Sequence, residues 1–348
     1  MNSPYFKEYP INLNWLSNQR LRTLLNEISS IHLPITLFDV GARWGIPTEL
    51  EPIKSILSRV GFDADSSACN ELNEQSHNLF NSNVYPFFIG SVDGEVEFFL
   101  YEDRSASSIL KPNIRYKRLF EPNLNISKSI NLHSVTLDTF LRKNSNIQPP
   151  DILKIDTQGS ELDVLKGGVN LLKSTVLVDV EVQFIKQYEN AVCFEDILSF
   201  MRAHGFDLVY LNRVTQQRFG CPLYSKGQLT FGDAIFARRE DCLDGFSDSA
   251  LIRYILILFN YGFFDIAYSL LEKIPDSKEK NIITQVFNRT FQEKLYSKIL
   301  RILNPIIDNF ILFLLNLRKH NSLFLDSDRS WPTRSFLTTV NLLVNLTK

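Results

Sequence analysis

The chain has 348 residues, of which 44% are hydrophobic, which suits a globular protein of one or two domains. Its 37 basic and 39 acidic residues give a net charge of −2, so no general positive field is available to bind nucleic acid. The four cysteines lack the spacing of a zinc site or a disulfide framework. We therefore expect reduced thiols in a cytoplasmic protein.

Both ends of the chain are predicted to be helical. Residues 11–30 carry leucines at helical spacing, so residues 1–34 are interpreted as an N-terminal helical extension without a secretory signal. Residues 241–348 are poor in strand signals and are predicted to form a C-terminal helical region. Its most apolar run, 299–317, is interrupted by proline and charged residues, so we expect no transmembrane segment. Three roles stay open for this region: covering the site, dimerisation, or binding a partner protein.

Residues 35–240 alternate between strand and helix patterns. Strands are expected at 34–40, 59–65, 84–90, 149–156, 175–184, 207–212 and 229–239. Helices are expected at 48–59, 66–82, 161–174 and 193–206, and residues 115–134 are interpreted as a loop. Alternation of this kind predicts a parallel α/β sheet with helices on both faces.

The ends of the first two predicted strands carry residues typical of a nucleotide-like ligand. The stretch LFDVGARWGIP places Gly41 and Gly45 after Asp39, and Asp63 follows 24 residues later. Glycine lets the backbone turn tightly beside a ligand, and a carboxylate at the second strand can hold ribose hydroxyls. The loop lacks the third glycine of a dinucleotide fingerprint. A D-x-G-x-x-x-G loop favours a ligand with an amino acid tail, such as S-adenosylmethionine, although a plain strand-to-helix turn is the alternative.

Six segments of this region carry a family resemblance: FDVGARWG, GFDAD, SVDGEVEFFLYEDRSASSI, VTLDTFL, ILKIDTQGSELDVLKGG and DVEVQF. They resemble the FkbM-type methyltransferases, a branch of the class I enzymes that depend on S-adenosylmethionine. The most specific segment is LKIDTQGSELDVLKGG, at residues 153–168. The resemblance covers roughly residues 35–240 and implies a methyltransferase domain with a Rossmann-like, mostly parallel seven-stranded sheet.

The resemblance also implies roles for individual residues. The segments that it places around the cofactor are the glycine loop, the acid after the second strand, the adenine edge and the loop over the site. The matching positions are Asp39, Gly41, Ala42 and Gly45 for the methionine part, Asp63 and Asp65 for the ribose, Gly90 and Ser91 for the adenine, and Ser107 and Ser108 in the covering loop. The family often has Glu-Pro where this chain has Asp63–Ala64, which is a mild departure.

Transfer of a methyl group to a hydroxyl needs a base within reach of the acceptor oxygen. Asp156 is the first candidate, because its strand is expected beside the cofactor strand, and Glu181 and His133 follow. Each has a simpler explanation. Asp156 could order the next loop, His133 could face solvent, and Glu161 is expected to support a helix N-terminus. Asp156 with Glu181 could also hold a divalent cation, but we predict no metal site.

The sequence therefore predicts an S-adenosylmethionine-dependent O-methyltransferase. The resemblance implies that the acceptor is a small molecule or glycan hydroxyl, on a sugar, glycan or secondary metabolite. A basic and aromatic segment at 104–128 is either an acceptor-binding lid or an ordinary solvated loop. Two other classes compete: a nicotinamide-dependent oxidoreductase, which would need the third glycine, and a non-catalytic adaptor, which would not need the acidic strand ends.

Overall fold

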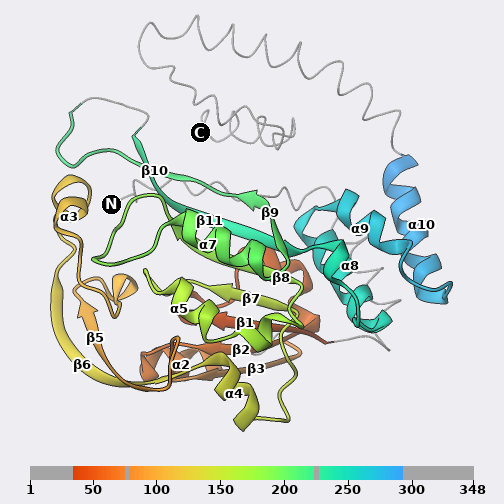
Figure 1. Cartoon of the computed structure of the whole chain (residues 1–348), viewed down its shortest axis with the longest axis horizontal. Helices are drawn as coiled ribbons and strands as arrows, with labels where there is room; N and C mark the ends of the chain where they lie inside the picture. Colours follow the sequence, from red (N-terminus) through yellow and green to blue (C-terminus); the bar gives the residue numbers. More distant parts are fainter. Residues whose placement is uncertain (1–33, 75–78, 223–226, 293–348) are drawn as a thin grey trace, which may run out of the picture.

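The computed structural model describes residues 34–74, 79–222 and 227–292 of the chain. Its main sheet has the strand order β10-β11-β8-β7-β1-β2-β3, and β9 also pairs with β11 (Figure 1). The strands are β1 (Ile35–Val40), β2 (Leu57–Phe62), β3 (Asn81–Tyr85), β7 (Ile152–Ile155), β8 (Leu177–Gln183), β9 (Phe206–Leu211), β10 (Val214–Gln216) and β11 (Gln228–Arg238). The strands from β3 to β8 along this order are parallel, and β11 runs antiparallel to β8. This is the predicted class I arrangement.

The strand count differs from the prediction, because the main sheet has eight strands instead of seven. The extra strand is β10, which follows β9 after a short interruption of the extended backbone. Both strands pair with the same edge of β11, one after the other. At the interruption, the Asn212 N–H donates to the Asp233 carbonyl at 2.8 Å. Gly232 lies against this turn, where a Cβ would be 1.9 Å from the Asn212 carbonyl oxygen.

Both faces of the main sheet are covered by helices. One face packs against α4 (Leu137–Lys143), α5 (Glu161–Lys166), α6 (Val169–Leu172) and α7 (Phe194–Ala203). The other face packs against the 3-10 segment Thr48–Ile56 and the helices α8 (Asp248–Tyr261) and α9 (Phe264–Leu271). Alternate residues of β1 enter the two cores, so all six of its residues are buried.

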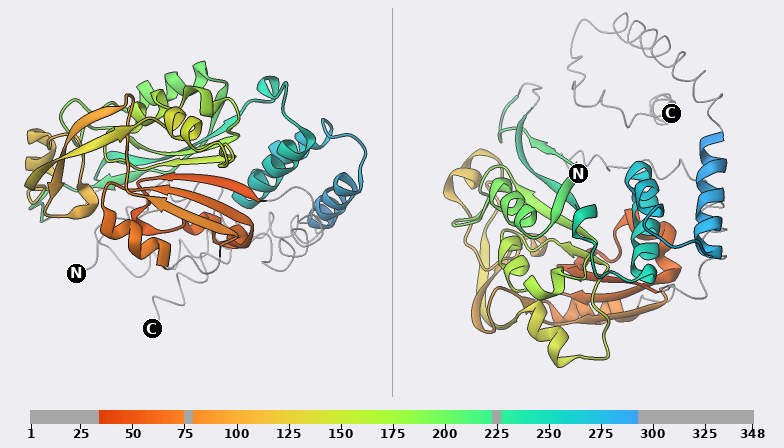
Figure 2. Two further views of the ribbon diagram at one scale, coloured as in Figure 1. Left: turned by 90° about the horizontal axis from the view of Figure 1, so that it is seen from below. Right: turned by 45° about the vertical axis from the view of Figure 1, so that its right-hand side comes forward.

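The first part of the predicted C-terminal region thus shares a core with the sheet. Arg253 on α8 donates to the Asp151 carboxylate at 2.9 Å, and Asp151 also accepts from the Thr36 N–H at 2.9 Å. Figures 1 and 2 show α8 and α9 grouped with α10 (Lys278–Gln292), on the side away from β5 and β6. The domain boundary at residue 240 stays a prediction. The predicted N-terminal helix and the apolar run 299–317 lie outside the described residues.

Several expectations about local structure were wrong. The predicted helix at 66–82 overlaps β3, which begins at Asn81, and the predicted strand at 84–90 is divided, because β3 ends at Tyr85 and Phe88–Ile89 belongs to another sheet. The predicted loop at 115–134 contains α3 (Ile114–Leu119) and β6 (Ile126–Val135), and β6 forms a second sheet with β4 (Phe88–Ile89) and β5 (Gly94–Tyr101). The predicted helix at 48–59 is 3-10 from Thr48 to Ile56, with Pro52 inside it. Pro52 has no N–H to donate to an α-helical ladder, and Leu57 already pairs with Ile35 as the start of β2.

Candidate active site

The order of the parallel strands reverses between β1 and β7, which is where α/β sheets hold their ligands. The carboxyl ends of the two strands are joined there, because the Asp156 N–H donates to the Val40 carbonyl at 2.9 Å. Gly41 follows β1 with a left-handed φ of +83°, and a Cβ on it would lie 1.9 Å from the Asp156 carbonyl oxygen. The backbone of the first turn therefore requires glycine even before a ligand is considered.

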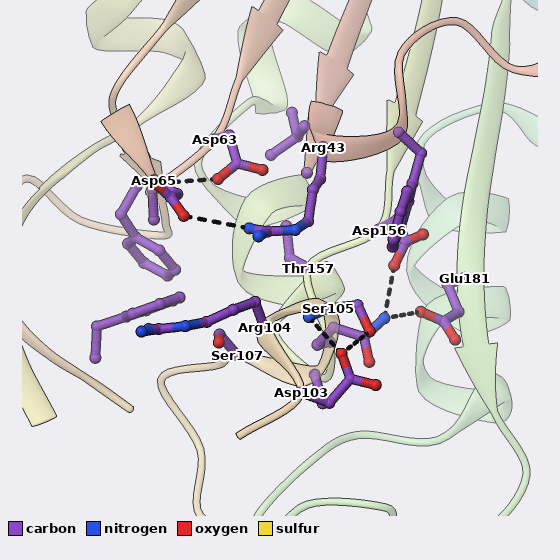
Figure 3. Close-up of a pocket in the computed structure, with 18 of the residues that line it drawn as sticks. Arg43, Asp63, Asp65, Asp103, Arg104, Ser105, Ser107, Asp156, Thr157 and Glu181 are labelled. Atoms are coloured by element: carbon purple, nitrogen blue, oxygen red, sulfur yellow. Dashed lines mark hydrogen bonds and ion pairs between the residues drawn. The ribbon is translucent and has the colours of Figure 1, made fainter. Parts of the chain in front are cut away.

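A cleft of about 370 Å³ opens at this switch point (Figure 3). Its walls come from the carboxyl ends of β1, β2, β7 and β8, from the segment after β3, and from the segment after β5. A volume of this size is within the range of small-molecule and cofactor sites. Figure 3 places Asp63, Asp65 and Arg43 at one side of the cleft and Asp156 and Glu181 at the other.

The acids after β2 form one side of the cleft. The Asp63 carboxylate accepts from the Asp65 N–H at 2.8 Å, and Asp65 forms an ion pair with Arg43 at 3.5 Å. Burial raises the pKa of Asp63, whereas hydrogen bonds from Ser67 lower the pKa of Asp65. Asp63 is thus the more desolvated acid, at the position where a ribose would need an acceptor of hydrogen bonds.

Asp39 has a structural partner that the sequence analysis missed. Its carboxylate is buried and accepts from Arg59 at 2.9 Å, and the same guanidinium nitrogen donates to the Ala42 carbonyl at 2.9 Å. The buried ion pair thereby links β1 to β2, and the hydrogen bond from Arg59 to Ala42 stabilises the glycine turn. An arginine inside the mostly apolar strand LSRVGF was the signal that could have revealed it, because a buried cation needs a partner.

Asp156 and Glu181 form an acidic pair at the opposite side. The amide nitrogen of Gln158 lies 2.8 Å from an oxygen of each carboxylate. Burial raises the pKa of Glu181 well above its ordinary value, and the neighbouring charge of Asp156 raises it further. Glu181 can therefore take up a proton more readily than an ordinary glutamate, which is what a general base for an alcohol requires.

Lys154 and Glu161 support this side. Lys154 lies 3.9 Å from the Asp156 carboxylate; burial disfavours its charge, but the surrounding carboxylates, Asp156 first among them, raise its pKa overall. Glu161 is buried and accepts from the N–H groups of Thr157 at 3.1 Å and Gly159 at 2.9 Å. Burial raises its pKa to about 7. Glu161 lies in the first turn of α5, as expected, and its carboxylate orders the loop after β7.

The structure brings some of the predicted residues together and leaves others apart. Gly41, Asp63, Asp65, Ser107, Asp156 and Glu181 line the cleft. In the described part of the chain, the lining does not include Asp39, Ala42, Gly45, Gly90, Ser91 or His133. Gly90 packs near Gly167, whose added Cβ would lie 2.1 Å from the Gly90 carbonyl. His133 lies in the second sheet, 58% exposed and 3.5 Å from Glu95.

Two parts of the lining were not singled out from the sequence. Phe87, Phe88 and Ile89 follow β3 and give the cleft an apolar wall just before the predicted Gly90–Ser91 edge. Tyr188 is buried, and its hydroxyl lies 3.1 Å from the carbonyl of Ala106, in the segment 104–108 that follows β5 and covers the cleft. Nothing in the local pattern around Tyr188 distinguishes it from a core tyrosine.

The described residues contain neither a metal-binding cluster nor a helix that could span a membrane. Within residues 34–74, 79–222 and 227–292, no cluster of three or more histidine, cysteine or acidic side chains is arranged to hold a metal ion. Across the same ranges, every helix is too short or too polar to cross a membrane.

Comparison with known proteins gives one family match. Residues 39–208 match the family model described as the methyltransferase FkbM domain. No curated protein matches the sequence.

Solved structures match at low identity. An FkbM methyltransferase from Methylobacillus flagellatus is 12% identical, over 59% of this chain and 46% of its own, with a TM-score of 0.31. This chain thus spans about half the length of that protein. Magnesium protoporphyrin IX methyltransferase from Synechocystis, with bound S-adenosylmethionine, is 8% identical over 64% and 79% of the two chains, with a TM-score of 0.31. Precorrin-6y C5,15-methyltransferase from Geobacter metallireducens is 10% identical over 67% and 95%, also at 0.31.

Proposed function

We propose that this protein transfers a methyl group from S-adenosylmethionine to a hydroxyl oxygen. Residues 39–208 match the FkbM methyltransferase domain, which supports the proposal. The observation that carries the proposal is the arrangement of the switch-point cleft. A desolvated acid, Asp63, stands at one side, the acidic pair Asp156 and Glu181 stands at the other, and the glycine turn lies between them. The side that holds Asp63 is suited to bind a nucleoside, and the side that holds the acidic pair is suited to remove a proton from the acceptor.

The residues present fit the cofactor. Asp63 would accept from the ribose hydroxyls, and Asp65 with Arg43 would border the same part. Gly41 would lie beside the methionine part, because it has no side chain between the backbone and the cleft. Phe87 and Phe88 would face the adenine, for which aromatic and apolar contacts are suitable. When bound, S-adenosylmethionine supplies a methyl group on a sulfonium, which is a good leaving group.

The acidic pair supplies what the acceptor needs. A hydroxyl is a weak acid, so its proton must leave as the oxygen attacks. We assign this proton to the Asp156–Glu181 pair, because the two carboxylates share the Gln158 amide as a donor and the pKa of Glu181 is raised by burial and by Asp156. The exposed His133, on the second sheet, is not part of the proposal.

Calorimetry with three ligands tests the cofactor assignment. We expect S-adenosylmethionine and S-adenosylhomocysteine to bind, and NAD to bind at least about a hundredfold more weakly. The glycine turn has no anion-binding fingerprint for a pyrophosphate, which explains the difference. Asp63→Asn should weaken the binding of S-adenosylhomocysteine, whereas the exposed Glu97→Gln on β5 should leave it unchanged. A folded protein that binds neither sulfur compound would refute the methyltransferase proposal.

The charge of the cleft supports an uncharged acceptor, such as a hydroxyl of a sugar, glycan or secondary metabolite. Its lining contains more acids than bases, and Arg43 is already paired with Asp65. The acids are Asp63, Asp65, Asp103, Glu121, Asp156 and Glu181, and the bases are Arg43 and Arg104. An anionic group beside the partly desolvated Asp156 and Glu181 would be repelled.

Matched pairs of acceptors test this preference. We expect labelled methyl to pass from S-adenosylmethionine to neutral sugars or glycans with a kcat/KM at least about tenfold above that of their phosphate esters, because like charges in a site cost binding energy. The ratio should shrink at high salt if the repulsion is electrostatic. A preference for the phosphate esters would contradict the assignment of an uncharged acceptor.

A further inference from the structure

Gln158 occupies an unusual place between the two carboxylates of the acidic pair. Its backbone has a φ of +57°, and among the described residues only Asn190 is another non-glycine residue with a positive φ. Side chains rarely adopt this left-handed conformation, and it is found where the surrounding structure enforces it. In this chain the conformation turns the Gln158 side chain back toward the ends of β7 and β8.

The side-chain amide of Gln158 is fully engaged. Its nitrogen donates one hydrogen to Asp156 Oδ1 at 2.8 Å and the other to Glu181 Oε2 at 2.8 Å. Its oxygen accepts from the Tyr188 hydroxyl at 3.0 Å. The reverse orientation would aim the amide oxygen at two carboxylates, so the network fixes which end of the amide faces the pair.

The same residue connects the acidic pair to the segment that covers the cleft. The Gln158 backbone carbonyl accepts from the Ser108 hydroxyl at 2.7 Å, and Ser108 is completely buried. The Tyr188 hydroxyl that contacts the amide also lies 3.1 Å from the Ala106 carbonyl. The loop after β7, the segment after β8 and the covering segment 104–108 therefore meet at Gln158.

We propose that Gln158 is a positioning residue, which holds Asp156 and Glu181 in one geometry and favours their charged forms. This inference rests on the proposed function, because it concerns the base of that reaction. A single amide that donates to two carboxylates offsets part of their mutual repulsion and of their desolvation. It also fixes the two carboxylates relative to one another through one shared donor, at the side of the cleft where an acceptor hydroxyl would lose its proton.

Other charged groups face the pair and also influence how readily it takes up a proton. Lys154 on β7 favours the charged forms of the pair, and nearby acids disfavour them. The acids and the phenol that face the pair or Lys154 are Asp39, Glu161, Asp179, Asp233 and Tyr188. Gln158 stands out among these neighbours as the neutral donor shared by both carboxylates.

The test is the pH dependence of thermal stability in Gln158→Met, in which the side chain keeps its length and loses its donors. Without them, the folded state should retain the proton of the pair to higher pH. An acid whose pKa is raised by folding contributes stability at low pH that is lost as the pH rises through the folded pKa. The gap in Tm between wild type and variant should therefore widen by about 2–4 °C from pH 5 to pH 8.

Two further variants make the result specific. Gln183→Met, at the end of β8, removes a buried hydrogen bond to the Gln187 N–H and touches neither carboxylate, so its Tm gap should not change with pH. Tyr188→Phe removes the hydroxyl that orients the Gln158 amide. Its difference in Tm from the wild type should also widen as the pH rises, but by a smaller amount. Tyr188→Phe also carries the test if Gln158→Met does not fold.

A gap that stays constant with pH in both Gln158→Met and Tyr188→Phe would overturn the proposal and leave Gln158 a purely structural residue. Binding of S-adenosylhomocysteine to the wild type, measured by calorimetry at the same pH values, reports on the proposed function separately. If that binding fails while the pH-dependent gap is present, the role of Gln158 toward the pair stands and the methyltransferase assignment falls.

Discussion

Glu181→Gln and Asp156→Asn should each lower methyl transfer by about 10²–10⁴-fold, which is the usual contribution of a general base. Both substitutions keep the shape of the side chain and remove its ability to take a proton. Because neither residue belongs to the side of the cleft that holds Asp63, binding of S-adenosylhomocysteine should stay within a few-fold of wild type. The measurement is kcat with labelled S-adenosylmethionine, combined with calorimetry on each variant.

The pH profile gives this prediction a second signature. The base must be deprotonated to act, and burial together with Asp156 raises the pKa of Glu181. The rate should therefore fall as the pH drops below this raised pKa, so the acidic limb should lie above the range in which an ordinary glutamate titrates. In Asp156→Asn the acidic limb should move to lower pH, because the charge that raises the pKa of Glu181 is gone.

Glu97→Gln provides the matched control, because Glu97 is an exposed acid on β5 outside the lining of the cleft. Its kcat should equal that of the wild type. If Asp156→Asn and Glu181→Gln both kept turnover within about threefold of wild type, the acidic pair would be excluded as the base. The cofactor assignment would then rest on the calorimetry alone.

The sheet could be predicted because each of its central strands is marked locally. The run Ile35–Val40 is mostly apolar and lies between Pro34 and Gly41, and Leu177–Gln183 is rich in valine, which favours a strand. β6 was missed because its sheet has an exposed face, so polar residues interrupt the apolar period from Ile126 to Val135. The start of β2 was missed because its register with β1 decides it, and pairing is not visible in the segment itself.

Those residues of the site could be predicted that are acids at the carboxyl ends of predicted strands. Asp63, Asp156 and Glu181 follow or end strands, and topology then brings them to one cleft. The roles of Arg59 and Gln158 depend on contacts between segments. Arg59 contacts Asp39, which is 20 residues away in the sequence, and Gln158 contacts Glu181, which is 23 residues away. The second contact also depends on the left-handed backbone of Gln158, which the sequence does not predict. Such contacts follow from the fold and cannot be read from local spacing.

Gly41→Ala should destabilise the protein by about 3 kcal/mol or more, and it should also displace Asp156. Two effects add at this position. The φ of +83° is unfavourable for any side chain, and the new Cβ would lie 1.9 Å from the Asp156 carbonyl oxygen, a backbone atom that cannot rotate away. Relief of the contact would separate the carboxyl ends of β1 and β7, where the Asp156 N–H now donates to Val40 at 2.9 Å.

Gly45→Ala separates these two effects, because Gly45 lies in the same turn with a φ of +81° and its added Cβ would meet only the Leu72 side chain, at 4.0 Å. Its ψ of −151° lies outside the left-handed helical region, where side chains other than hydrogen are rarely accommodated, so this variant should lose about 1–3 kcal/mol from the backbone conformation alone. Chemical unfolding gives both free energies, and calorimetry with S-adenosylhomocysteine shows whether Gly41→Ala also loses the ligand. A loss of only about 1–2 kcal/mol in Gly41→Ala, which is the cost of the left-handed conformation alone, would mean that the close approach to Asp156 carries no cost. The requirement for glycine at position 41 would then lie in the turn and not in the junction between β1 and β7.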